Sequence, residues 1–205
     1  MTTRTGCRPL TDEEVLTLSE YYDCEIESGE DPNALRDFAL IMFGFYVGSR
    51  ISETLSLRVK DVWQYKRVNS SVYFAKENTK GKRSGRTGTL NDECKEILTK
   101  YIKHYKLDLT PENGLWFSKK GNLKSSRARQ IISDAFKECE FDGKVASHTC
   151  RKTFARKGYE KMKDSLVDLK ECLGHKSLDS TMSYISHNKE KVNEFLDNLS
   201  YKQLG

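Results

Sequence analysis

The sequence lacks long apolar runs. None of its 205 residues belongs to an apolar stretch near the roughly 20 residues that a membrane-spanning helix requires. The first residues, MTTRTGCRPLTDEE, also lack the apolar centre of a signal peptide. We therefore predict an intracellular protein, located in the cytoplasm, with no membrane partner.

Paired cysteines are missing as well. Six cysteines are scattered along the chain with no CxxC pair and no histidine at zinc-finger spacing, which argues against a zinc site or a disulfide framework. We predict reduced, mostly buried thiols and no metal site. These cysteines are Cys7, Cys24, Cys94, Cys139, Cys150 and Cys172.

The charge is distributed unevenly. The formal net charge is only +5, yet residues 11–37 carry ten acidic residues and one basic residue, so the remaining chain is strongly basic. Two basic clusters stand out, KENTKGKRSGR from Lys76 and SKKGNLKSSRAR from Ser118. Such runs can be solvated faces, but two of them flanked by glycine and serine favour a polyanion partner, with nucleic acid as the first candidate.

Apolar periodicity predicts a mainly α fold with one small antiparallel β-sheet (α+β), in one domain over residues 1–205. The segment SSVYFAKENTKGKRSGRTGTL places β-branched and aromatic residues on both sides of a basic centre, which predicts a hairpin with a basic tip. Helices are expected over 12–22, from Pro32 or Asn33 to a break near Gly48, and over 50–57 and 92–106. Three more helices are expected to start at a Ser125 or Ser126 cap, at about Ser147 and at about Ser180. GLWFS is expected to be extended, and 188–205 to form an amphipathic tail helix.

The segment SHTCRKTFAR places a histidine and an arginine three residues apart. With Ser147 as the N-cap, His148 and Arg151 would share one face of the first helical turns. The positive end of the helix dipole favours an anion such as phosphate at that position. A plain surface pair is the alternative.

Arg50 follows directly on an apolar helix, where an unpaired guanidinium is costly. Glu53, three residues later, is a candidate partner, either as a purely structural pair or as a group that orients an arginine which also grips phosphate. Farther along, LGHKSLDSTMSY supplies His175 and Tyr184. A tyrosine becomes a useful nucleophile only where neighbouring cations stabilise its phenolate, and ordinary packing is the alternative for Tyr184.

Four segments, in this order, resemble the motif boxes of the tyrosine recombinases, also called the phage integrase family. They are GSRISETLSLRVKDV, TKGKRSGRTGTL, SHTCRKTFAR and LGHKSLDSTMSYI, and the resemblance covers roughly residues 10–190. It implies the catalytic-domain fold of the family, double-stranded DNA as the partner, and strand cleavage and rejoining as the reaction.

The resemblance also implies a role for each matching residue. Tyr184 would attack a phosphodiester to give a 3'-phosphotyrosyl intermediate and a free 5'-hydroxyl, which conserves the bond energy, so that no cofactor is needed. Arg50 and Arg151 would stabilise the transition state, and His148 and His175 would hold the phosphate and assist proton movement. Lys80, with Lys82 as fallback, would protonate the departing oxygen, and Glu53 would have a supporting role. The expected DNA contacts are Lys76, Lys82, Arg83, Arg86, Lys119, Lys120, Lys124, Arg127, Arg129 and Lys152.

Some features depart from the family pattern or leave alternatives open. Lys152 stands where many relatives carry histidine, and no N-terminal core-binding domain precedes the short arm 1–10. Either the chain is a cut piece or it is a short member, and the start MTTRTGCRPL favours the latter. The tail 188–205, with apolar Val192, Phe195, Leu196 and Leu199, would dock on its own domain or be exchanged between protomers of a homo-oligomer. A tyrosine-type topoisomerase and a catalytically silent DNA-binding protein of the same fold are the alternative functions.

Overall fold

The computed structural model describes residues 6–78, 85–162, 165–174 and 178–182. Among them, the helices are α1 (Asp12–Ser28), α2 (Ala34–Val47), α3 (Ile51–Leu55), α4 (Val59–Val62), α5 (Asp92–His104), α6 (Ser125–Glu138), α7 (Ser147–Lys161), α8 (Leu166–Leu173) and α9 (Leu178–Met182). The strands are β1 (Trp63–Gln64), β2 (Arg67–Val68), β3 (Ser71–Phe74), β4 (Arg86–Thr89), β5 (Phe117–Ser118) and β6 (Gly121–Asn122). Two short 3-10 helices are η1 (Lys76–Asn78) and η2 (Leu107–Leu109).

The strands pair as local hairpins. β1 pairs with β2, β3 with β4 and β5 with β6, all antiparallel, and Phe74 lies opposite Arg86 in the second pair. The mainly α fold class with small antiparallel sheet structure is confirmed, and so is the hairpin flanking the basic segment. The prediction of a single sheet is wrong for the described residues, because each short strand finds its partner across its own turn.

Helix α2 forms the centre of the core. It is apolar on nearly every side, and α1, α5 and α7 all pack on it. Gly44 allows a close approach of α7, since a Cβ there would lie 3.0 Å from the Cβ of Cys150. The expected break at Gly48 is confirmed: this residue takes φ 60° as the left-handed cap, and Arg50 follows at the start of α3.

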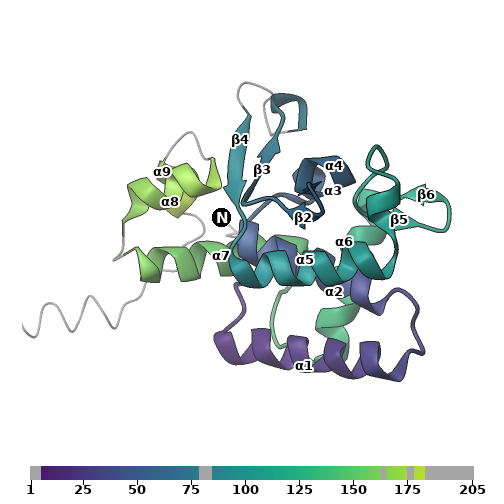
Figure 1. Ribbon diagram of the computed structural model, residues 1–205. Coiled ribbons are helices and arrows are strands. Elements are labelled where there is room, and N and C mark those ends of the chain that lie inside the picture. The colour runs from purple at the N-terminus through teal and green to yellow at the C-terminus, as the bar shows by residue number, and fades with distance from the viewer. Residues whose placement is uncertain (1–5, 79–84, 163–164, 175–177, 183–205) are drawn as a thin grey trace, which may run out of the picture.

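Helix α1 lies on the opposite side of the molecule from the β3–β4 hairpin (Figure 1). Its predicted capping box is present, with the Thr11 side chain accepting from the Glu14 N–H and the Glu14 carboxylate accepting from the Thr11 N–H. The helix continues to Ser28 instead of ending at 22, because Ile26 still packs on the core and the left-handed Gly29 ends it. The acidic segment therefore lies away from the basic hairpin.

Two helix starts differ from expectation, and two helices, α4 and α8, were not expected. Ser147 is already helical and Ala146 is the N-cap of α7, where the Thr149 hydroxyl accepts from the Ala146 N–H. Lys124 caps α6 in place of Ser125 or Ser126. Helix α8 was not predicted; Leu169 and Leu173 pack with Ala155 of α7 in a second, smaller core cluster.

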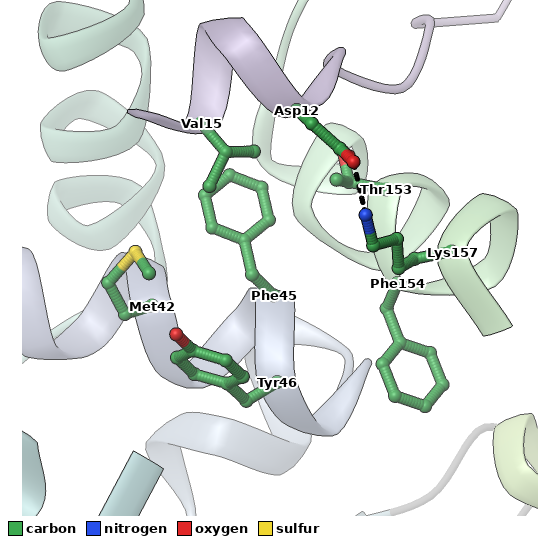
Figure 2. A pocket seen from close by; sticks show the side chains of 8 residues that line it. All are labelled: Asp12, Val15, Met42, Phe45, Tyr46, Thr153, Phe154 and Lys157. Atoms are coloured by element: carbon green, nitrogen blue, oxygen red, sulfur yellow. Dashed lines mark hydrogen bonds and ion pairs between the residues drawn. The ribbon is translucent and has the colours of Figure 1, made fainter. Parts of the chain in front are cut away.

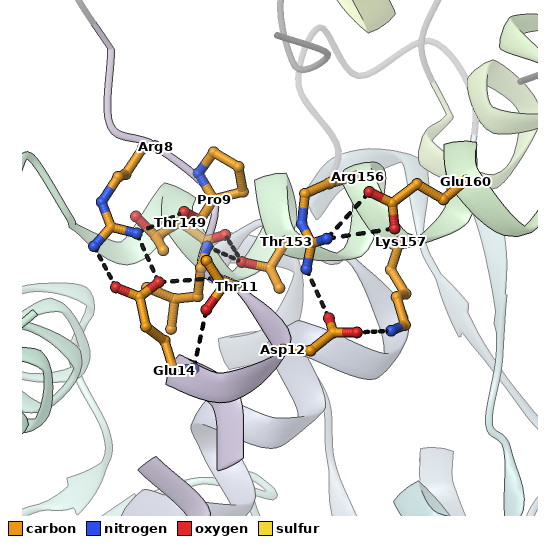
Figure 3. A network of polar contacts seen from close by, with 11 residues as sticks. Arg8, Pro9, Thr11, Asp12, Glu14, Thr149, Thr153, Arg156, Lys157 and Glu160 are labelled. Carbon is orange, nitrogen blue, oxygen red and sulfur yellow. Dashed lines mark hydrogen bonds and ion pairs between the residues drawn. The ribbon is translucent and has the colours of Figure 1, made fainter. Parts of the chain in front are cut away.

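The start of α1 and the residues just before it are tied to α7 (Figure 3). The buried Leu10 N–H donates to the Thr153 hydroxyl at 2.9 Å. Asp12 accepts from Arg156 at 2.7 Å and also from Lys157. This segment therefore fixes the outer side of the helix whose first turns carry His148 and Arg151.

No helix in the described part of the chain is both long and apolar enough to span a bilayer. Three of the six cysteines, Cys7, Cys94 and Cys150, are buried, Cys139 and Cys172 are half-buried, Cys24 is exposed, and all six are free thiols.

Candidate active site

A buried carboxylate organises the site. Glu53 is fully buried, and its Oε1 accepts from Arg50 Nη1 at 2.7 Å. Its Oε2 accepts from the Arg50 N–H at 3.0 Å and from Arg86 at 2.8 Å through Nη2 and 3.2 Å through Nε. The Arg50–Glu53 contact expected from the spacing is therefore present, and a second arginine joins it.

Glu53 stays ionised in this environment. Burial by itself raises the pKa of the carboxyl. The charge of Arg86 and the hydrogen bonds from the Arg50 backbone and both guanidinium groups lower the pKa by more than burial raises it, so the net shift is downward. The carboxylate thus keeps the full charge that holds the two arginines in place.

Arg151 joins three parts of the site. Its side chain is 1% exposed, although it carries a permanent charge. Nη1 donates to the carbonyl of Gly48, at the end of α2, and Nη2 donates to the carbonyl of Leu173, at the end of α8, at 2.7 Å. Because Gly48 is two residues before Arg50, these bonds bring Arg151 to the same end of α2 as Arg50.

His148 lies within the field of both arginines. Partial burial lowers its pKa, and the positive charges of Arg151 and Arg50 lower it further, followed by those of Arg129 and Lys152. The imidazole is therefore neutral at neutral pH and can accept a proton. Arg50, Glu53, His148 and Arg151 are the predicted site residues that the structure brings together.

The other predicted catalytic residues lie outside the described residues. These are Lys80, its fallback Lys82, His175 and Tyr184. Arg83, one of the expected DNA contacts, also lies outside the described residues. The whole tail 188–205 is outside them as well, including Val192, Phe195, Leu196 and Leu199, so its exchange between protomers is not tested. Their roles stay predictions.

Most of the expected DNA contacts are on the surface. Lys76 is exposed in η1, and Lys119 and Lys120 are exposed at the turn between β5 and β6. Lys124, Arg127 and Arg129 are exposed at or near the start of α6, and Lys152 is half-buried on α7. Figure 1 shows the β3–β4 and β5–β6 hairpins away from the acidic α1.

Arg86 is placed differently from the other expected DNA contacts. Its side chain is 8% exposed, and its guanidinium lies 4.6 Å from the centre of the Phe74 ring while binding Glu53. The expectation of a direct DNA contact does not fit this placement, because all three guanidinium nitrogens already donate to Glu53 or to the Cys172 carbonyl. No local sequence signal links Arg86 to a carboxylate 33 residues earlier, so its contact with Glu53 was missed.

A separate hollow lies between α1, α2 and α7. It has a volume of about 300 Å³, and Val15, Met42, Phe45 and Phe154 give it a mostly apolar lining (Figure 2). None of its lining residues belongs to the Arg50–Glu53–Arg151 site. In the described ranges, no group of three or more histidine, cysteine or acidic side chains is arranged to hold a metal ion.

Known proteins with similar sequences and folds support one family. The phage integrase family model matches residues 8–191. Probable integrase/recombinase YoeC of Bacillus subtilis is 30% identical over 172 residues, 83% of this chain and 85% of YoeC. Tyrosine recombinase XerH of Campylobacter jejuni is 26% identical over 178 residues, 85% of this chain but 48% of XerH, so the chain spans about half the length of that relative.

Solved structures agree on the fold. XerH recombinase bound to palindromic difH substrate, in a post-cleavage complex, superposes with a TM-score of 0.75 at 22% identity, covering 96% of this chain and 54% of that one. XerA recombinase superposes with a TM-score of 0.71 at 22% identity, covering 98% and 68%. Together with the motif boxes and the buried arginine site, these matches show that the chain belongs to the phage integrase family, as a tyrosine recombinase catalytic domain.

Proposed function

We propose that this chain cleaves and rejoins double-stranded DNA at specific sites through a covalent bond between Tyr184 and a 3'-phosphate. The observation that carries the proposal is the convergence of Arg50, His148 and Arg151 around the end of α2. These groups come from segments about a hundred residues apart, and fixed cations are what the pentavalent phosphoryl transition state requires.

Each described residue has a step in this chemistry. Arg50 and Arg151 bind the non-bridging oxygens of the scissile phosphate and stabilise the charge that builds on them. Neutral His148 hydrogen-bonds the phosphate and accepts a proton during the attack. Glu53 holds Arg50 in position through a 2.7 Å bond.

The remaining steps belong to residues predicted from the motif boxes. Tyr184 attacks the phosphorus, and Lys80, or else Lys82, donates the proton to the departing 5'-oxygen. His175 assists at the phosphate. Since the phosphotyrosyl ester conserves the bond energy and the free 5'-hydroxyl reverses the step, the reaction uses no cofactor.

The DNA partner would lie along the basic hairpin side. The cations expected to contact it are Lys76, Lys82, Arg83, Lys119, Lys120, Lys124, Arg127, Arg129 and Lys152, and among the described ones all except the half-buried Lys152 are exposed. The XerH recombinase of similar fold, solved with its palindromic difH substrate after cleavage, supports a substrate of the same kind for this chain. Binding should weaken steeply with salt, because each neutralised phosphate releases counterions.

The decisive experiment is to incubate the protein with nicked suicide duplexes and look for a denaturation-resistant protein–DNA adduct. We expect an adduct from the wild type and none from Tyr184→Phe, which keeps the ring and removes the nucleophilic oxygen. An adduct with Tyr184→Phe would show that the nucleophile is another residue.

Supercoiled plasmid without a target site is the control for the alternative activities. The names of the relatives favour recombination over a topoisomerase and over a silent DNA-binding protein. Relaxation of any plasmid by a monomer would contradict site-specific recombination, and DNA binding without any adduct would support the silent protein.

Assembly and location follow from the same proposal. The tail 188–205 either docks on its own domain or joins two copies on DNA, and Phe195→Asp in the full chain separates the two. Loss of higher-order protein–DNA complexes with an intact monomer supports exchange. A DNA substrate also supports a location in the cytoplasm, associated with the nucleoid if the source is bacterial.

A further inference from the structure

Arg86, the first residue of β4, lies where four segments meet. Its guanidinium donates twice to Glu53 Oε2 of α3 and packs over the buried Phe74 ring of β3. Its Nη1 donates to the carbonyl of Cys172 in α8 at 3.3 Å. The side chain therefore ties the β3–β4 hairpin to two segments that border the site.

The charges of this cluster do not cancel. Glu53 supplies one negative charge, and Arg50 and Arg86 supply two positive charges, so the three groups together carry +1. An isolated Arg50–Glu53 pair would be neutral, and the attraction of Arg50 for a phosphate would be largely offset by the carboxylate 2.7 Å away. Arg86 restores the positive charge without itself reaching the surface.

The end of α8 is held by the same residue. Arg86 binds the Cys172 carbonyl and Arg151 binds the Leu173 carbonyl, so two arginines occupy the negative end of this helix. Gly174 follows at φ 61°, and a Cβ on it would lie 2.8 Å from the Arg86 Cδ. Arg86 thus packs against the backbone residue directly before His175.

We infer that Arg86 is a positioning residue for strand cleavage: it keeps Arg50 competent to bind phosphate by sharing Glu53, and it fixes the end of α8 beside Arg151. The inference rests on the proposed function. This role replaces the direct DNA contact expected from the sequence, because all three nitrogens of the Arg86 guanidinium already donate to Glu53 or to the Cys172 carbonyl.

The first test compares Arg86→Gln with the wild type in single-turnover cleavage of a suicide duplex and in DNA affinity over a range of salt concentrations. We expect about a tenfold or greater loss of cleavage rate and a much smaller loss of DNA affinity, because Arg50 stays in place and most of the expected DNA contacts lie elsewhere. A direct phosphate contact would instead weaken binding and reduce the salt slope by about one. Unchanged cleavage, or that binding pattern, would overturn the inference.

The matched control is Arg58→Gln. Arg58 also pairs with a glutamate, Glu112, but its side chain is 55% exposed, and it makes no hydrogen bond or ion pair with the site residues that the structure describes. We expect its cleavage rate to stay within about twofold of the wild type. An equal loss in both variants would mean that any lost ion pair slows the enzyme, which contradicts a specific role for Arg86.

A double-mutant cycle with Glu53→Gln tests whether Arg86 acts through the carboxylate. Once Glu53 is neutral, nothing offsets the charge of Arg50, so adding Arg86→Gln should cost less than about threefold further in rate. Full additivity of the two losses would contradict action through Glu53.

Two further measurements keep the outcomes distinct. Thermal unfolding reports whether Arg86→Gln is folded, and Arg86→Lys, which keeps the charge, should recover part of the lost rate; no recovery would contradict the charge argument. Inorganic phosphate titrated against the His148 NMR signal needs no catalysis. Weaker phosphate binding by Arg86→Gln than by the wild type supports the inference. It does so even if the wild type forms no adduct, because a missing adduct defeats only the proposed function. Equal phosphate binding would overturn the claim that Arg86 supplies charge to Arg50.

Discussion

Two carboxylates that each bind two cationic side chains lie in different surroundings. In one, Glu53 binds Arg50 and Arg86, and the three side chains are 0%, 18% and 8% exposed. In the other, Asp12 binds Arg156 and Lys157, and the three are 55%, 26% and 47% exposed (Figure 3). The pKa of both carboxyls is lowered, for Glu53 against the effect of burial and for Asp12 by the hydrogen bonds from Lys157 and Arg156. One carboxylate between two cations therefore forms a fixed site when it is buried and a weak surface contact when it is solvated.

Helix α7 contributes an arginine to each environment. Arg151 is 1% exposed and its guanidinium binds two backbone carbonyls, whereas Arg156, five residues later, binds Asp12 and Glu160 at the surface. One helix thus offers a matched pair of arginines for testing what burial contributes.

The largest expected effect comes from Arg151→Ala. We expect cleavage of a suicide duplex to fall by about a hundred- to a thousandfold, because a preorganised donor to the transition state is lost, while DNA affinity changes far less. Arg156→Ala is the control and should change cleavage by less than about threefold. Equal losses of binding and cleavage in Arg151→Ala would contradict its role at the transition state.

The next effect is on stability. Glu53→Gln leaves two guanidinium groups without their buried carboxylate and should lower the free energy of unfolding by about 3 to 5 kcal/mol. Asp12→Asn removes the equivalent carboxylate from the solvated cluster and should cost about 0 to 1 kcal/mol. Urea denaturation of both variants against the wild type measures the difference. Similar costs would mean that burial does not separate the two clusters.

The same pair has a pH signature. The pKa of Glu53 in the folded protein is below its ordinary value of 4.5, so its stabilising contribution is complete above that pH and is lost as the pH falls through the folded pKa. The stability gap between the wild type and Glu53→Gln should therefore be largest near neutral pH and shrink below about pH 4.5. A gap that is constant from pH 7 to pH 3 would mean that the carboxylate charge is not what stabilises the cluster. Denaturation midpoints measured across this range provide the check.

Local patterns predicted a large part of this architecture. The capping box of Thr11 and Glu14, the break at Gly48 and the strands beside the basic segment all depend on neighbours within a few residues, and the structure contains each of them. The Arg50–Glu53 contact was predictable for the same reason, since the two residues are three apart. Gly29, a left-handed cap, was a usable signal for the true end of α1.

The long-range contacts could not be predicted in this way. Arg86 reaches Glu53 across 33 residues and Cys172 across 86, and a basic residue in a lysine-rich segment looks like another surface cation until its burial is known. Helix α8 is short, and Leu169 and Leu173 are the buried residues that fix it against α7. The motif order indicated which residues belong to the site, but only the fold shows that one carboxylate serves two arginines.

The smallest expected effect is the response of the two clusters to salt. Raising the salt concentration from about 0.05 to 0.5 M shortens the screening length to a few ångströms, which weakens contacts between solvated charges more than buried ones. The stability difference between the wild type and Asp12→Asn, at most about 1 kcal/mol, should then nearly vanish, while the Glu53→Gln difference should keep most of its size. Glu14→Gln is a second surface control, since Glu14 binds Arg8 with side chains that are 21% and 32% exposed. If the Glu53 difference shrinks as much as that of Asp12, water and ions reach the site cluster, and the charge that Arg86 supplies to Arg50 would be screened before any phosphate arrives.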